Sequence, residues 1–224
     1  MTVADTHDVR DPELPGRLLT AERDALVPLL RERPAEDFAA PTCCPGWTVR
    51  HVLAHCGAVL SRVVESRFEE GVFGPESNDR DIAERDAWAV ARVVDELERG
   101  MTEAGPVIAE AGGVLDGIAL GEWVHAGDVR EAWELPGAYG GAQLGPALEL
   151  LAHLTRVRGT LPLHADLDDL DEPLRLGAAT GDGPPARYIG DATTLVRLCS
   201  GRRPPADTTY ELAGATEAEL NLYA

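Results

Sequence analysis

Residues 49–64, VRHVLAHCGAVLSRVV, decide the fold. Their apolar side chains recur three and four positions apart for about four turns, which places them along one face of an amphipathic α-helix. Thr48, directly before them, is a suitable N-cap because a threonine hydroxyl accepts a hydrogen bond from a backbone N–H of the first turn. The pattern predicts a helix with one buried face, and such a face needs partner helices.

Similar patterns on either side of this segment predict the partners. Helices are expected over residues 13–33, 79–102, 116–134 and 146–158, with residues 107–111 as a candidate continuation of the second of these after Pro106. The helix over residues 116–134 has apolar side chains on opposite sides, which indicates an interior helix. The proline-rich residues 34–47 are expected to form a connection.

The pattern changes beyond Leu161. We expect short strands over 173–178, 186–189 and 208–212, a helix over 191–199 and a solvated acidic linker over 166–172. The sequence therefore predicts a mainly α protein with a helical domain over residues 13–160 and a small α/β domain over residues 161–224. Residues 1–12 lack apolar periodicity and are expected to be a mobile leader.

Composition limits the function classes. The 224 residues include 20 basic and 39 acidic side chains, and the net charge of −19 argues against binding to nucleic acid or to an anionic membrane surface. The sequence has neither a transmembrane segment nor a signal peptide, so we expect a cytoplasmic protein with a small-molecule substrate. Its four cysteines form no C-x-x-C motif and are expected to be reduced, small and buried.

Two of the six histidines, His51 and His55, are four residues apart, which puts both imidazoles on one helix face. On a helical wheel His55 lies at the border of the apolar face, whereas His51 lies on the solvent side. His55 is therefore the better candidate metal ligand. The alternative is a border histidine that is hydrogen-bonded to a carbonyl group.

A second candidate cluster, Glu122-x-x-His125-x-x-Asp128, lies within the interior helix. Steps of three residues spread two carboxylates and an imidazole over one surface of that helix. Burial of charged groups is costly unless they are paired or bind a metal. A hydrogen-bonded carboxylate–histidine pair would meet this requirement without a metal.

If His55 meets Glu122 and His125 between the helices, they form a two-histidine, one-carboxylate set with an open coordination position, as catalytic divalent-metal sites require. Asp128 would then accept the remaining ring N–H of His125 and raise its donor strength. A serine hydrolase or a nucleotide-dependent enzyme has less support, because the sequence contains no G-x-S-x-G, G-x-G-x-x-G or Walker A motif.

Residues 44–55, CPGWTVRHVLAH, resemble the C-x-G-W-T/S-V-R-D-V-x-A-H-L stretch of the mycothiol-dependent maleylpyruvate isomerase family, a branch of the DinB-like metalloproteins. Residues 122–128, EWVHAGD, resemble the E…V-x-H-G-x-D element of that family. Residues 190–203, GDATTLVRLCSGRR, are similar to its C-terminal segment, G-x-A-x-x-L-x-x-x-x-x-G-R. Together the matches span about residues 13–215.

The resemblance implies a DinB-like four-helix bundle, a small α/β C-terminal domain and a divalent metal, usually zinc. Matched residue by residue, the implied ligands are His55, Glu122 and His125, while His51 stands where the family usually has aspartate. The family commonly places its glutamate four residues before the second histidine, a position held here by Gly121.

In such enzymes, the resemblance implies, the metal binds the thiol of mycothiol and presents it as the nucleophilic thiolate. The thiolate adds to a conjugated cis double bond, the new single bond rotates, and elimination leaves the trans isomer. Arg202 or Arg203, at the family's Gly-Arg position, is a candidate to stabilise the developing negative charge, the alternative being a helix cap. Trp47 and Trp123 are candidate cofactor-binding pocket walls, the alternative being core packing.

These features predict a metal-dependent, mycothiol-using isomerase or S-transferase that acts on an electrophilic small molecule, such as a maleylpyruvate-like cis-enoyl acid. One alternative keeps the metal ligands but carries out a thiol-independent hydrolytic or biosynthetic reaction. Another is a non-catalytic binding module. The sequence assigns no oligomeric state.

Overall fold

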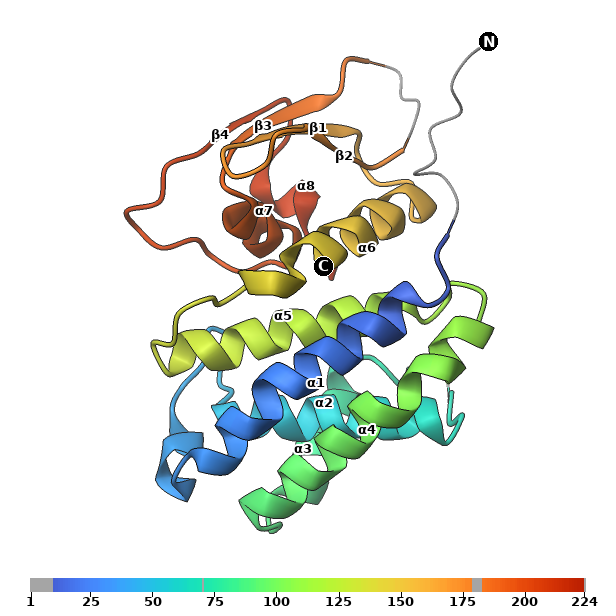
Figure 1. Cartoon of the computed structure of the whole chain (residues 1–224), viewed down its shortest axis with the longest axis vertical. Helices are drawn as coiled ribbons and strands as arrows, with labels where there is room; N and C mark the ends of the chain where they lie inside the picture. Colours follow the sequence, from blue (N-terminus) through green and yellow to red (C-terminus); the bar gives the residue numbers. More distant parts are fainter. Residues whose placement is uncertain (1–9, 70, 179–182, 224) are drawn as a thin grey trace. The chain divides into compact units, whose positions relative to one another are not determined.

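The structure, a computed structural model, describes residues 10–69, 71–178 and 183–223. Residues 1–9 of the expected leader lie outside the described residues. The chain divides into two compact units, one over residues 12–138 and one built around residues 139–223. Figure 1 labels the helices and strands of both units.

The unit over residues 12–138 is the expected four-helix bundle. Its helices are α1 (Leu14–Glu32), α2 (Val49–Val64), α4 (Val90–Glu110) and α5 (Asp116–Ala132). Both α1 and α2 pack against α4 and α5, so the four helices surround one apolar core. The approach of α1 to α4 is close because Gly16 faces Gly105, where a Cβ atom on either residue would lie 3.0–3.2 Å from the Cα atom of the other.

The segment expected as one helix over residues 79–102 consists of two helices, which corrects that prediction. Helix α3 (Pro75–Arg85) ends before α4 begins. The guanidinium group of Arg50, on α2, donates hydrogen bonds to the backbone carbonyls of Arg85, Asp86 and Trp88, which are therefore held in a turn. Helix α4 continues through Pro106, as the candidate continuation suggested, since Met101, Ala104 and Ile108 are buried on both sides of the proline.

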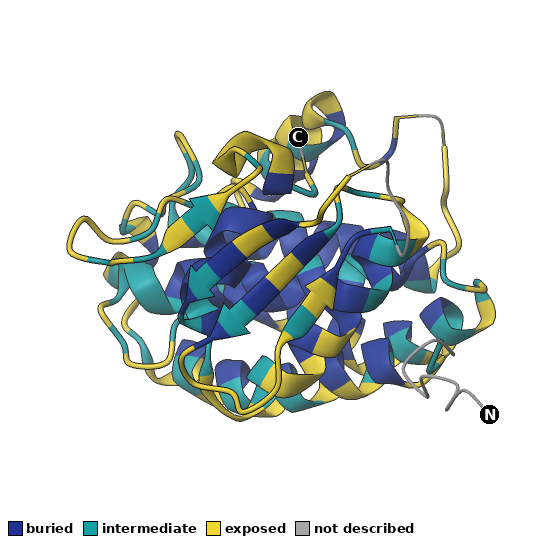
Figure 2. Ribbon diagram, turned by 90° about the horizontal axis from the view of Figure 1, so that it is seen from above, coloured by how far each residue is buried: buried dark blue, intermediate teal, exposed yellow. Residues whose placement is uncertain are grey.

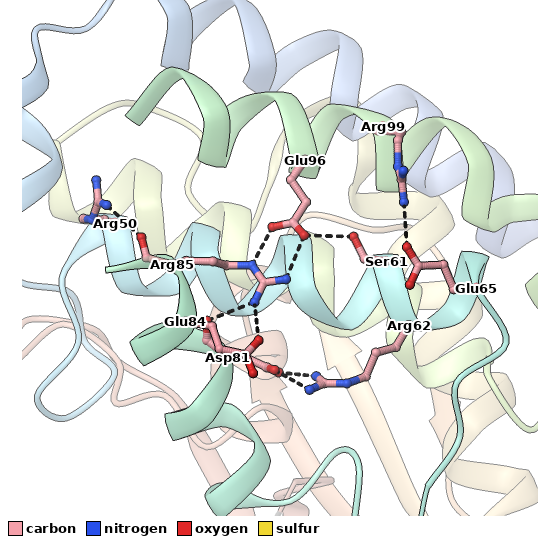
Figure 3. Close-up of polar contacts among 9 residues, drawn as sticks. All are labelled: Arg50, Ser61, Arg62, Glu65, Asp81, Glu84, Arg85, Glu96 and Arg99. Carbon is pink, nitrogen blue, oxygen red and sulfur yellow. Dashed lines mark hydrogen bonds and ion pairs between the residues drawn. The ribbon is translucent and has the colours of Figure 1, made fainter. Parts of the chain in front are cut away.

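Charged side chains attach α3 to the bundle (Figure 3). The guanidinium of Arg62, on α2, forms a bidentate ion pair with the fully buried carboxylate of Asp81. Arg85 donates to both carboxylate oxygens of Glu96, on α4, at 2.5 and 2.7 Å, and Ser61 donates to the same carboxylate. Buried charges are tolerated here because each has an opposite partner.

The second unit combines helices with a mixed sheet. In the described residues its helices are α6 (Leu144–Val157), α7 (Ala192–Cys199) and the short α8 (Glu217–Leu220), and its strands are β1 (Leu163–Leu167), β2 (Leu174–Leu176), β3 (Ala186–Gly190) and β4 (Glu211–Ala213). The strand order is β2-β1-β3-β4, with β1 parallel to β3 and the other two pairs antiparallel. Helix α6 packs against β2, and α7 packs against β3 and α6.

Strand β1 was not predicted, because part of it lies in the acidic run that we assigned to a linker. Leu163, Ala165 and Leu167 are buried while the side chains between them are not, and β3 shows the same alternation. Figure 2 shows this alternation as stripes along the strands. Alternate burial is what a strand with one covered face requires, and in β1 His164 and Asp166 belong to the other face.

The mainly α architecture with a small α/β unit is confirmed. The boundary between the compact units falls between Ala138 and Tyr139, whereas the sequence suggested residue 160. Helix α6 consequently belongs with the sheet and not with the bundle. No helix in the described part of the chain is long and apolar enough to cross a membrane.

Candidate functional site

The loop before α2 and the cap of that helix position His55. Thr48 accepts a hydrogen bond from the backbone N–H of His51, and the ring Nδ1 of His51 accepts one from the backbone N–H of Thr48. This reciprocal cap gives His51 a structural role and fixes the start of α2. His55 follows one turn later on the same helix and is partly buried.

Helix α5 supplies the other side of the site. It packs against both α1 and α2, which explains why apolar residues occupy opposite sides of it. Glu122 and Asp128 are buried on this helix, and His125 between them is partly buried. The expectation of an interior helix is therefore confirmed.

The rings of His55, His125 and Trp47 form one cluster. The two imidazole centroids are 5.3 Å apart with the rings nearly perpendicular. Trp47 lies 5.1 Å from the ring of His55 and 6.3 Å from that of His125, by centroid distance. The structure thus brings together two histidines that are far apart in the sequence and places an indole against both.

Asp128 orients His125. Its Oδ2 atom lies 2.8 Å from the ring Nδ1 of His125, and the aspartate side chain is fully buried. An ionised carboxylate has no proton to donate, so Nδ1 carries the hydrogen, and in the neutral imidazole Nε2 then has the lone pair. This is the tautomer that a metal-binding Nε2 requires, and the contact has the geometry expected of Asp128.

Glu122 lies beside Cys56, a buried residue of α2. Burial raises the pKa of Glu122 to about 8, although the hydrogen bond from the Cys56 thiol favours the charged form. The Oε2 atom is buried and has no hydrogen-bond partner among the described residues. A bound cation would favour the ionised carboxylate and occupy this oxygen, so the side chain fits a metal ligand.

Asp128 of the same helix belongs to a different cluster of potential ligand atoms, together with two cysteines of the loop before α2. In the described part of the chain, one group of three potential metal ligands has all its ligand atoms within 4.8 Å of one another. It consists of Cys43, Cys44 and Asp128. Glu122, which contacts Cys56, is not part of such a group with the two histidines. The ligand set of His55, Glu122 and His125 therefore stays a prediction.

The sequence did not single out Cys43 and Cys44. We expected all four cysteines to be buried, and this is wrong for Cys43, which is exposed, and for Cys44, which is partly exposed. Both thiols contact Asp128, at 3.1 and 3.3 Å. The available signal was the position of the pair in the proline-rich loop, since loop residues are seldom core residues.

The structure also places the other residues that the sequence suggested for the cofactor and the substrate. Trp123 is 2% exposed, which supports the core-packing alternative. Arg202 donates a hydrogen bond to the carbonyl of Ser200 at 2.6 Å, at the end of α7, as a helix cap does. Arg203 follows it in the same unit, and a role for either arginine toward substrate stays a prediction.

The fold and these side chains define a helical-bundle protein with a buried polar cluster between α2 and α5, joined to an α/β unit. The family model of the mycothiol maleylpyruvate isomerase N-terminal domain matches residues 19–138. The chain belongs to this family.

Solved structures agree with this fold. The crystal structure of a mycothiol-dependent maleylpyruvate isomerase is 19% identical over 96% of this chain and 98% of its own, with a TM-score of 0.56. A histidine-to-alanine variant of a mycothiol-dependent maleylpyruvate isomerase has 18% identity, the same coverage and the same TM-score. No curated protein matches the chain.

Proposed function

We propose that this protein is a metal-dependent enzyme that uses mycothiol as a thiol cosubstrate and acts on an electrophilic small molecule of the maleylpyruvate type, as an isomerase or an S-transferase. The observation that carries the proposal is the pair of imidazoles 5.3 Å apart, one of them oriented by a buried carboxylate. Membership of the mycothiol maleylpyruvate isomerase family supports an enzyme of this class.

His55, Glu122 and His125 are the residues that we assign to a divalent metal, with zinc as the first candidate. Such a metal, when bound, lowers the pKa of a coordinated thiol, so that the thiol is ionised at neutral pH. Asp128 holds the proton on Nδ1 of His125 and keeps its Nε2 directed away from that carboxylate. Trp47 lies against both rings, and we assign it to the wall of the cofactor pocket.

The proposal also assigns the side chains that bind the substrate. A carboxylate substrate that gains negative charge needs a cationic partner, and we assign this role to Arg203 before Arg202, because Arg202 caps α7. We further assign the protein to a reducing compartment such as the cytoplasm, where cysteines that are not joined in disulfides stay reduced.

One observation favours a second candidate function. Glu122 lies three residues before His125 and hydrogen-bonds to Cys56, and this contact supports a changed ligand set. A relative with such a change would bind metal without using a thiol, for a hydrolytic or biosynthetic reaction. Its signature is metal binding with no response to mycothiol.

Metal analysis and calorimetric titration with mycothiol test the proposal. We expect His125→Ala to bind one equivalent of metal less than the wild-type protein, and to lose the thiol binding that requires this metal. His51→Ala is the matched control, because His51 caps the same helix that carries His55 and is not an assigned ligand. Full metal content in His125→Ala, or thiol binding by the metal-free protein, would contradict the assignment.

A further inference from the structure

Cys43 and Cys44, which the proposed function does not use, form a cluster with Asp128. The Cys43 thiol donates to Oδ1 of Asp128 at 3.1 Å, and the Cys44 thiol donates to Oδ2 at 3.3 Å. Side chains of adjacent residues point in opposite directions along an extended chain. Convergence of both sulfur atoms on one carboxylate therefore requires a specific loop conformation.

The loop has the hydrogen bonds that fix this conformation. The backbone N–H of Trp47 donates to the carbonyl of Cys44, and the backbone N–H and the hydroxyl of Thr42 both donate to the carbonyl of Trp47. The Thr42 hydroxyl also accepts from the backbone N–H of Cys44 at 3.3 Å. Gly46 adopts a φ of 78°, a left-handed conformation that favours glycine. Both thiols are thus held over α5 by the loop itself.

The spacing of the three ligand atoms fits a small cation. They lie within 4.8 Å of one another. Tetrahedral zinc, with bonds of about 2.3 Å to sulfur and about 2.0–2.2 Å to oxygen, holds neighbouring ligand atoms roughly 3.6–3.8 Å apart. Thiolate ligands select soft or borderline cations, and the exposed Cys43 gives such a cation access from solvent.

We propose that Cys43, Cys44 and Asp128 form a second cation site, specific for a thiophilic divalent cation such as zinc or cadmium. Binding forms two metal–sulfur bonds and one metal–oxygen bond, and the two thiol protons pass to the solvent. Three protein ligands leave a fourth position for water or an external donor. The assignment includes none of the ligands assigned to the first metal, although Asp128 also contacts His125.

The site has a structural consequence for the histidine pair. A cation there joins the loop that ends at Trp47 to α5, which carries His125. Asp128 takes part in both clusters, because its Oδ2 atom also contacts the Nδ1 atom of His125. Occupation of the second site would therefore hold the Trp47 ring and the His125 ring in place together.

Titration of the full chain with cadmium alone tests this proposal, after treatment with a chelator and a phosphine reductant. Cadmium bound by thiolates gives a sulfur-to-metal charge-transfer absorption in the ultraviolet, which histidine and carboxylate ligands do not give. We expect this absorption to saturate at one equivalent and to persist in His55→Ala. We expect it to disappear in Cys43→Ser/Cys44→Ser, and cadmium affinity to fall at least tenfold in Asp128→Asn.

Cys199→Ser is the matched thiol control, because Cys199 is buried in α7 and belongs to the other unit. It should leave the absorption unchanged. Cys43 is exposed, so the single variant Cys43→Ser should fold, and its circular dichroism spectrum verifies this. An absorption that survives in the double variant, or that is absent from the wild-type protein, would overturn the second site. Loss of the absorption in His55→Ala would show that thiolate binding of cadmium requires the histidine pair, and it would overturn a separate site.

Discussion

Glu122 is a buried carboxyl group whose charge state depends on what lies beside it. Its side chain is 3% exposed, and the Cys56 thiol, on α2, donates a hydrogen bond to the carboxyl group. Because burial penalises the charged form more than this thiol favours it, the pKa rises to about 8. In the metal-free protein Glu122 is therefore largely protonated at neutral pH.

This raised pKa predicts how the stability of the metal-free protein depends on pH. The folded state holds a proton on Glu122 that the unfolded state releases near its ordinary pKa of 4.5, so stability falls as pH rises from about 4.5 to about 8. The expected loss is on the order of a few kcal/mol across this range, and Glu122→Gln should remove most of it. Urea unfolding of chelator-treated protein at several pH values measures the effect.

The control for this experiment is Glu103→Gln, which alters an exposed glutamate of α4 and should keep the pH dependence of the wild-type protein. Saturating zinc should reduce the dependence in the wild-type protein, because a cation stabilises the ionised carboxylate. Parallel pH profiles for the wild-type protein and Glu122→Gln would show that Glu122 does not carry the effect.

At the scale of elements, the ion pairs of Figure 3 explain how a polar helix becomes part of the bundle. Helix α3 buries few apolar side chains, and its buried residues are Ser77, Asp81 and Arg85. Its attachment to α2 and α4 consequently depends on charge pairing with Arg62 and Glu96. Removal of one member of a buried pair leaves the other charge uncompensated.

Asp81→Asn should therefore destabilise the bundle by about 3–5 kcal/mol, because Arg62 loses its buried counter-charge. Urea unfolding followed by tryptophan fluorescence measures the stability of the bundle, because all four tryptophans lie within residues 47–133. The matched control is Arg99→Gln, which removes exposed ion pairs of α4 and should cost less than about 1 kcal/mol. Equal losses in the two variants would exclude a special role for the buried pair.

The same elements show what sequence patterns can and cannot predict. Helix α2 was predicted from residue 49 to residue 64 because its apolar period and its threonine cap are local features. The break between α3 and α4 depends on Arg50, a residue more than thirty positions away, and strand β1 depends on pairing with β3. Such long-range contacts leave no local period in the sequence.

In the candidate site, too, the sequence predicted the residues with a local pattern and missed those without one. His55 was predicted from its place at the border of the apolar face of one helix, and His125 and Asp128 from their spacing on another. The structure brings these residues into one cluster. Cys43 and Cys44 were missed because they reach Asp128 through a turn, which has no regular period. Cys56, the neighbour of Glu122, was expected only to be reduced and buried.

At the scale of the whole molecule, the net charge of −19 is the dominant electrostatic feature. Like charges repel in the compact state, and salt screens this repulsion. Exposed ion pairs, such as those of Arg31 with Asp95 and Glu98, are screened as well, but each contributes little to stability. Repulsion should therefore outweigh the lost attraction as salt is added.

We accordingly expect the unfolding temperature of the full chain to rise by about 2–4 °C between roughly 10 mM and 150 mM sodium chloride, over which the Debye length falls from about 30 Å to about 8 Å. Differential scanning calorimetry measures the shift. Potassium chloride should give the same rise, because screening depends on ionic strength and not on the identity of the cation. A fall in unfolding temperature would mean that exposed ion pairs stabilise the fold more than the excess of acidic side chains destabilises it.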